Sequence, residues 1–151
     1  MSDKLKEIGK LAYESIAEMV TALDCDYDRL DELKDSESLD EAEKEELAEL
    51  LDAADDCKNR DEALEVIQED ALSVEVRSGW APVGDCLQAE EFAILITTGG
   101  PAVRIRGELD EYRQPARAWL EVQDWGTPWT RYYDASQDVL LAYAECFYFG
   151  D

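Results

Sequence analysis

Apolar side chains recur every three or four residues through the first seventy positions, which is the spacing of amphipathic helices. A long first stretch lies behind a Ser2 or Asp3 cap, and a second, short stretch at 26–33 has Leu30 and Leu33 facing inward. The apolar members of the first stretch are Leu5, Ile8, Leu11, Ala12, Ile16, Met19, Val20 and Leu23. We therefore expect a long helix followed by a short one.

Two more helices are expected before residue 70. A short one at 61–69 begins with two acidic residues, which suit the positive N-terminal end of a helix. The other, at 39–56, has acidic side chains over most of its surface and one apolar face made of Leu39, Ala42, Leu47, Leu50, Leu51 and Ala54. The sequence therefore predicts a helical region with an anionic outer surface.

After residue 70 the period of the apolar positions changes to about 2, which is typical of strands. Alternating residues from Leu72 to Val76 predict a half-buried strand, and 77–90 is expected to be a loop. A continuous apolar run at 92–97 is typical of a central strand. A Gly-Gly-Pro turn joins it to a further strand at 103–106, so these two strands are expected to form a hairpin.

The last two predicted elements complete the fold. Alternation resumes at 116–122, and helical spacing returns at 135–147. We expect an α+β protein, with N-terminal acidic helices followed by a roughly four-stranded, mainly antiparallel sheet and a C-terminal helix packed on it. The expected division is an acidic helical region at 1–70 and a sheet-plus-helix domain at 71–151.

Charge is concentrated in one part of the chain. The 151 residues include 38 acidic and 14 basic side chains and no histidine, for a formal charge of −24. Residues 24–70 alone carry 21 acidic and 5 basic side chains. This charge excludes a protein that binds nucleic acid by neutralising phosphates. The hydrophobic content of 46% excludes a chain that its composition keeps unfolded.

Like charges four residues apart destabilise a helix by a few tenths of a kcal/mol, so the acidic helical run needs a physical explanation. Two interpretations are open. One interpretation is a solvated face that keeps the protein soluble. The other is mimicry of DNA. Carboxylates three or four residues apart on a helix lie about 5–6 Å from each other, and successive phosphates of one DNA strand are separated by about 3.4 Å along the duplex axis. A general solubility effect would not confine the charge beside a nearly neutral first helix, which favours mimicry.

Other chemistry has less support in the sequence. The absence of histidine excludes most metal sites, proton shuttles and activated nucleophiles that depend on this residue. The spacing of Asp24, Asp26 and Asp28 resembles the start of a calcium loop, but Arg29 stands where such a loop needs glycine. We therefore expect no metal and no cofactor. Four cysteines without a CxxC pair are expected to be mostly buried free thiols: Cys25, Cys57, Cys86 and Cys146.

Two features of the second half are candidates for contacts. The loop at 123–133 has aromatic side chains that either cap the core or anchor an interface: Trp125, Trp129, Tyr132 and Tyr133. Three arginines are expected on the solvent face of neighbouring strands, paired with Glu121 or Glu75 or in contact with acidic helices of the same chain or a second copy: Arg104, Arg106 and Arg117.

The size, the acidic run from Asp24 to Asp56 and the style of the block LSVEVRSGW…FAILITTGGPAVRIRGEL…LEVQDWGTPW…VLLAYAECFYFG resemble those of small acidic phage and mobile-element proteins. These are the anti-restriction and anti-CRISPR inhibitors that act as DNA mimics. The resemblance implies a non-enzymatic inhibitor that occupies the basic DNA-binding cleft of a nuclease or CRISPR effector. The expected partner-binding residues are Asp24, Asp26, Asp28, Asp31, Glu32, Asp40, Glu41, Glu45, Glu49, Asp52, Asp55, Asp56, Trp125 and Trp129.

Two other functions stay open at this point. One is an acidic adaptor or chaperone-like module that binds another basic DNA-binding protein. The other is an enzyme acting on a small cationic substrate, which predicts an enclosed pocket lined by acidic side chains. With neither a signal-peptide pattern nor a membrane-length apolar run, we expect a cytoplasmic protein, in the host cell if phage-encoded. We expect no direct contact with nucleic acid or membrane, and a homodimer is left open.

Overall fold

Each of the first four helices begins at a side chain that caps it. In the computed structural model, which describes residues 2–150, the caps accept hydrogen bonds from backbone N–H groups three residues further on: Ser2, Asp26, Asp40 and Asn59. Such a cap stabilises a helix by about 1 kcal/mol. The four expected helices are confirmed, as α1 (Asp3–Leu23), α2 (Tyr27–Asp35), α3 (Glu41–Ala54) and α4 (Arg60–Asp70).

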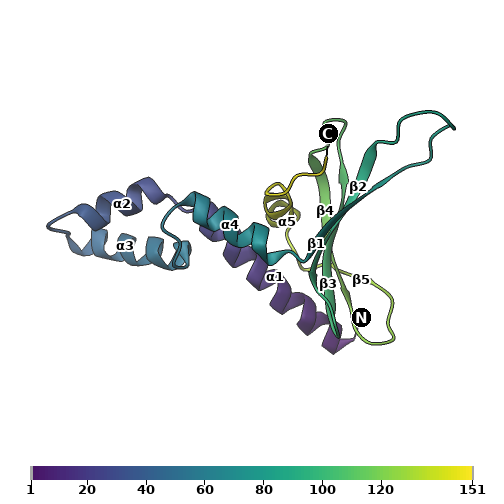
Figure 1. Ribbon diagram of the computed structural model, residues 1–151. Helices are drawn as coiled ribbons and strands as arrows, with labels where there is room; N and C mark the ends of the chain where they lie inside the picture. Colours follow the sequence, from purple (N-terminus) through teal and green to yellow (C-terminus); the bar gives the residue numbers. More distant parts are fainter. Residues whose placement is uncertain (1, 151) are drawn as a thin grey trace.

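The second half forms a five-stranded antiparallel sheet in which sequential strands are neighbours. The strands are β1 (Ser73–Ser78), β2 (Ala89–Thr97), β3 (Ala102–Leu109), β4 (Pro115–Gln123) and β5 (Thr130–Tyr132). Helix α5 (Gln137–Ala144) packs against β4 and α1 (Figure 1). The expected α+β class and its order of elements are confirmed. The short strand β5 was not expected and gives the sheet a fifth strand.

The register of the sheet aligns its apolar residues on one face. Ile94 lies opposite Ile105, Ile105 opposite Leu120, and Leu120 opposite Tyr132. All four side chains are buried beneath α1 and α5 in one hydrophobic cluster. The alternate residues of the same strands point to the opposite face, which none of the helices within residues 2–150 covers.

The main core does not stop at the expected boundary after residue 70. Ile16 of α1 and Ile67 of α4 are fully buried in the same cluster as the sheet residues. We call α1, α4, the sheet and α5 the body of the protein. The acidic helices α2 and α3 instead form a helical hairpin that projects from the far end of α1 and α4 (Figure 1). The expected division at residue 70 therefore runs through one shared core.

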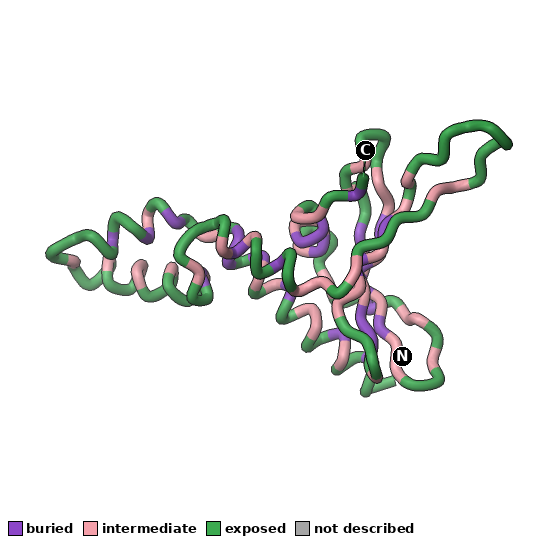
Figure 2. The backbone as a smooth tube through the Cα atoms, in the orientation of Figure 1, coloured by how far each residue is buried: buried purple, intermediate pink, exposed green. Residues whose placement is uncertain are grey.

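The projecting hairpin has a small core of its own, formed by Tyr27, Leu30 and Ala54 with half-buried neighbours. Figure 2 shows how little of this arm is buried compared with the body. Leu51 was expected on the apolar face of α3 but is 46% exposed, and Ala42 is also exposed. The reason is that α3 has α2 as its main neighbour over most of its length, so it can bury only a narrow stripe.

One hydrogen bond links the end of α4 to α5. The Tyr143 hydroxyl donates to Asp70 Oδ2 at 2.7 Å. Burial of the hydroxyl is the larger cause, and this hydrogen bond the next, of a raised pKa of Tyr143. We expect Tyr143→Phe to lower the free energy of unfolding by about 1–2 kcal/mol, because it leaves a half-buried carboxylate without its donor. Urea denaturation measures this loss. Tyr112→Phe, on an exposed turn, is the control and should change stability by less than about 0.5 kcal/mol.

Candidate functional site

The strongest candidate site is the acidic hairpin, which we define as residues 24–56. It contains 16 acidic and 3 basic side chains. All twelve acidic residues expected to bind a partner are exposed, and the structure brings them together on this one arm. The expected grouping of these carboxylates is thus present in three dimensions, whereas their contact with a partner stays a prediction.

On α3 the acidic side chains form a continuous outer row. Glu41, Glu45, Glu49 and Asp52 follow one another at spacings of four, four and three residues, so they lie along one side of the helix. Neighbours in such a row are about 5–6 Å apart. Asp28, Asp31 and Asp35 make a shorter row of the same kind on α2. Each of the two helices therefore presents regularly spaced negative charge along an exposed side.

One of the three basic side chains in the hairpin, Arg29, joins its two helices. Arg29 of α2 reaches Glu46 of α3 with two hydrogen bonds, of 2.8 and 3.0 Å, and contacts Glu32 at 3.0 Å. The hydrogen bonds from Arg29 lower the pKa of Glu46, and those to Glu46 and Glu32 raise the pKa of Arg29. Lys44 lies 3.5 Å from Glu41. Arg29 therefore ties α2 to α3, whereas the Lys44 contact is exposed and lies within α3.

A pocket of about 320 Å³ lies where the acidic hairpin meets the body. Its walls come from α1 and the end of α3 and include Glu18, Asp52 and Asp55. Cys57 contacts both the hairpin core and the main core, so it marks the joint between the two packed units. The negative surface therefore continues from the arm onto the outer end of α1.

The two expected tryptophans lie elsewhere. Asp124, beside Trp125, is bound by Lys4 at 3.0 Å, which places Trp125 near the N-terminal end of α1. The acidic hairpin follows the other end of this 21-residue helix, and a helix of that length spans about 30 Å. Trp129 packs under Arg104 on the open face of the sheet. The structure therefore does not combine these aromatic side chains with the carboxylates in one surface.

The aromatic loop divides between core and surface. Tyr132 is buried in the main core, whereas Trp125 and Tyr133 are exposed. Arg104 lies 4.0 Å above the Trp129 ring, and Arg131 lies 4.9 Å from the Tyr133 ring. The core interpretation thus holds for Tyr132, whereas an interface at the exposed rings stays a prediction.

The arginines of the open sheet face are paired within the chain. Arg104 binds Glu121 at 2.7 Å, as expected. Arg106 and Arg77 share Glu91, and Arg117 binds Glu108, so the alternative pairing with Glu75 is wrong. Sequence spacing alone did not reveal these partners because they depend on the register of β2, β3 and β4. This face is therefore close to electrically balanced, unlike the acidic hairpin.

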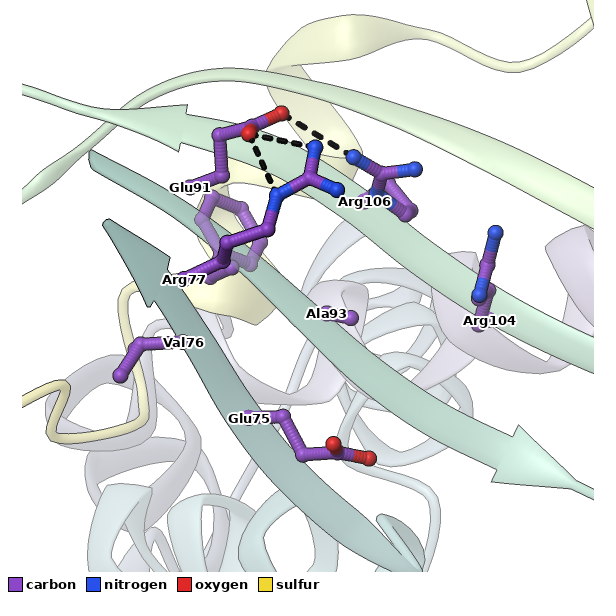
Figure 3. A pocket seen from close by; sticks show the side chains of 8 residues that line it. Glu75, Val76, Arg77, Glu91, Ala93, Arg104 and Arg106 are labelled. Carbon is purple, nitrogen blue, oxygen red and sulfur yellow. Dashed lines mark hydrogen bonds and ion pairs between the residues drawn. The ribbon is translucent and has the colours of Figure 1, made fainter. Parts of the chain in front are cut away.

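An open pocket of about 280 Å³ lies on this face above Ala93 (Figure 3). Glu91 and its two arginines form one side, and Glu75 of β1 stands apart from them. Among residues 2–150, no salt bridge includes Glu75. The sheet face thus has one unpaired carboxylate at its edge.

The sequence analysis missed an exposed apolar segment. The β1–β2 loop, residues 79–88, extends beyond the end of the sheet (Figure 1) and is exposed along almost its whole length (Figure 2). Trp80 and Val83 are fully exposed and Leu87 is 68% exposed. The signal available in the sequence was the presence of these three large apolar residues in a loop rich in Gly and Pro. The expected burial of the cysteines is also incorrect, since Cys86 in this loop is exposed and the other three are half-buried.

Comparison with known proteins leaves the site to be judged on its own geometry. No family model, no curated protein and no solved structure matches the chain. Within the described residues, no group of three or more histidine, cysteine or acidic side chains is placed to hold a metal ion. The helices in residues 2–150 include none with the length and apolar content needed to cross a membrane.

Proposed function

We propose that this chain is a non-enzymatic inhibitor that inserts the acidic hairpin into the basic DNA-binding cleft of a host-defence nuclease complex, a CRISPR effector or a restriction enzyme. The observation that carries the proposal is the arm itself, a projecting helical hairpin whose exposed surface is dominated by carboxylates. The protein would act stoichiometrically in the cytoplasm, by occupying the site that DNA needs.

The dimensions of the arm support this use. Two packed helices, each about 10 Å in diameter, make an arm about 20 Å across in its wider direction, which is close to the width of a DNA duplex, and about 10 Å across in the other. Helix α3 has 14 residues and is therefore about 21 Å long. Over that length one DNA strand presents about six phosphates, at a rise of about 3.4 Å each. A row of four carboxylates on α3, with more on α2, gives a comparable density of negative charge.

Electrostatics also predicts how binding depends on salt. A field of one sign attracts an oppositely charged cleft from a distance and raises the association rate. At about 0.15 M salt, charges further apart than about 8 Å are largely screened. The association rate constant with a basic cleft should therefore fall by about tenfold or more from low to high salt. Stopped-flow or biosensor kinetics across a salt series measures this fall.

The direct test is competition. A purified nuclease complex with a basic cleft is mixed with labelled DNA at low salt, and the protein is added in increasing amounts. We expect DNA binding to be lost at excess protein, with a stoichiometry of one acidic hairpin per cleft, and to recover as salt is raised. If the complex binds its DNA unchanged in excess protein at low salt, the proposal fails for that partner.

A second candidate is an adaptor or chaperone-like module that binds another basic DNA-binding protein. It is favoured by the exposed apolar β1–β2 loop, because an adaptor needs a second contact surface besides the acidic hairpin. The two candidates differ in the complexes that they form. An adaptor leaves the nuclease active in the competition assay and instead forms a ternary complex, whereas an inhibitor displaces DNA without a third component.

A further inference from the structure

The sheet has an open edge at β1. In the strand order β1-β2-β3-β4-β5, strand β1 pairs only with β2, and no other described strand lies against its outer side. Its six residues pair one after another, and the extra residue of the β1–β2 irregularity, Glu90, lies in β2. An exposed edge strand presents unpaired N–H and C=O groups on which a further strand can assemble.

The apolar side of this edge is also uncovered. Leu72 is 58% exposed, Val74 36% and Val76 49%, whereas Ile94, directly opposite Val74 in β2, is fully buried. The helices of the body therefore cover the inner strands and stop short of β1. No lysine or proline protects the edge between Leu72 and Ser78, although such residues are common guards against pairing.

We propose that β1 pairs antiparallel with β1 of a second copy of the chain, in a register centred on Val76. In this register Val76 lies opposite Val76 of the partner subunit, and Glu75 lies opposite the partner's Arg77. The symmetric pairing places each Arg77 opposite the partner's Glu75. The two five-stranded sheets then form one continuous sheet of ten strands. The proposal concerns a surface separate from the acidic hairpin and does not rest on the inhibitor function.

Charge selects this register over its neighbours. Centring the pair on Glu75 places two carboxylates opposite each other, and centring it on Arg77 opposes two guanidinium groups; like charges directly opposite are destabilising. Centring it on Val74 forms no ion pair. A slip of a single residue places the apolar face of one strand beside the polar face of the other. Only the register centred on Val76 unites the apolar faces and forms two ion pairs.

The surroundings of β1 fit the same arrangement. Glu75 is exposed and belongs to no salt bridge among the described residues, and the Arg77 side chain is 66% exposed despite its contact with Glu91 (Figure 3). In the proposed register the chain beyond Ser78 runs alongside the start of β1 in the other copy. Trp80, fully exposed in the single chain, then lies opposite the partner's Leu72 and can bury part of its ring there.

A charge swap tests both the dimer and its register. Sedimentation equilibrium of the full chain should show a dimer. Glu75→Lys or Arg77→Glu alone should weaken dimerisation by about tenfold or more, because positions 75 and 77, which face each other across the pair, then carry charges of the same sign. An equimolar mixture of the two variants should restore dimers, because the lysine introduced in one variant then faces the glutamate introduced in the other, and the unchanged Arg77 faces the unchanged Glu75. A monomeric wild-type protein at all soluble concentrations, or a mixture as weak as the single variants, overturns the proposal.

Cross-linking gives a second test that does not depend on charge. In a Cys86→Ser background, Val76→Cys should form an intermolecular disulfide under mild oxidation, because directly opposite Cα atoms lie about 4.5–5.5 Å apart, within the disulfide range of about 4.4–6.8 Å. Glu75→Cys should not, because it meets its own copy only diagonally, at about 7–8 Å. Cross-linking through position 75 instead of 76 contradicts the register. Capture of a strand from another protein with the wild-type chain still monomeric contradicts the dimer.

Discussion

Reversing the four carboxylates of the outer row of α3 should weaken binding to a basic cleft by about 100-fold, while the protein stays folded. The changes are Glu41→Lys, Glu45→Lys, Glu49→Lys and Asp52→Lys, and all four side chains are exposed. Exposed ion pairs contribute about 0.2–1 kcal/mol each, so the loss of four attractions and the gain of four repulsions amounts to roughly 3 kcal/mol. A difference of that size is about two powers of ten in the dissociation constant. Competition against labelled DNA measures it, and circular dichroism checks the fold.

The matched control changes the net charge by the same amount elsewhere. Glu7 and Glu14 on α1, with Glu65 and Glu69 on α4, are also exposed and can be changed to lysine together. If the acidic hairpin is the binding surface, this variant loses affinity only through the weaker long-range field, which salt screens. Equal losses in the two variants would mean that total charge matters and the row on α3 does not, as expected for a surface that serves solubility.

The helices were predictable because their signals are local. Ser2, Asp26 and Asp40 are side chains that cap helices, and the apolar spacing behind each is readable over one or two turns. Strand β5 escaped because Thr130–Tyr132 contains three residues, too few for an alternating pattern. Its place in the sheet depends on pairing with β4, which no local pattern contains.

What the helices pack against was not readable from the chain. The stripes of α1 and α2 look alike in sequence, yet Ile16 of α1 joins the core of the sheet and Leu30 of α2 joins the small core of the acidic hairpin. The exposure of the acidic side chains was predictable, because carboxylates are rarely buried without partners. The Arg29–Glu46 contact was not, since it joins residues 17 positions apart on different helices. The open edge at β1 was not predictable either, because it depends on the order of the strands in the sheet.

The hairpin core predicts a mutation that separates shape from charge. Leu30 is fully buried between α2 and α3, and its cluster is separate from the main core. Leu30→Ala should cost about 2–5 kcal/mol, the usual range for truncating a buried leucine. Because few other apolar contacts hold the hairpin, most of this cost should appear as local unfolding. Hydrogen exchange should therefore show lost protection at α2 and α3, with β2, β3 and β4 still protected. Leu120→Ala, in the main core, is the control and should lower protection throughout.

The same variant tests whether the proposed mimicry of DNA needs a fixed shape. Leu30→Ala keeps every carboxylate of the acidic hairpin, so the long-range attraction to a basic cleft is unchanged. An unfolded arm must be ordered again when it binds, and fixing each residue costs about 1–2 kcal/mol of conformational entropy. We therefore expect an association rate close to that of the wild type and a dissociation rate raised by about tenfold or more. If both rates matched the wild type, the charge of this segment would act without its helical geometry, and the spacing of the carboxylates along α3 would carry no part of recognition.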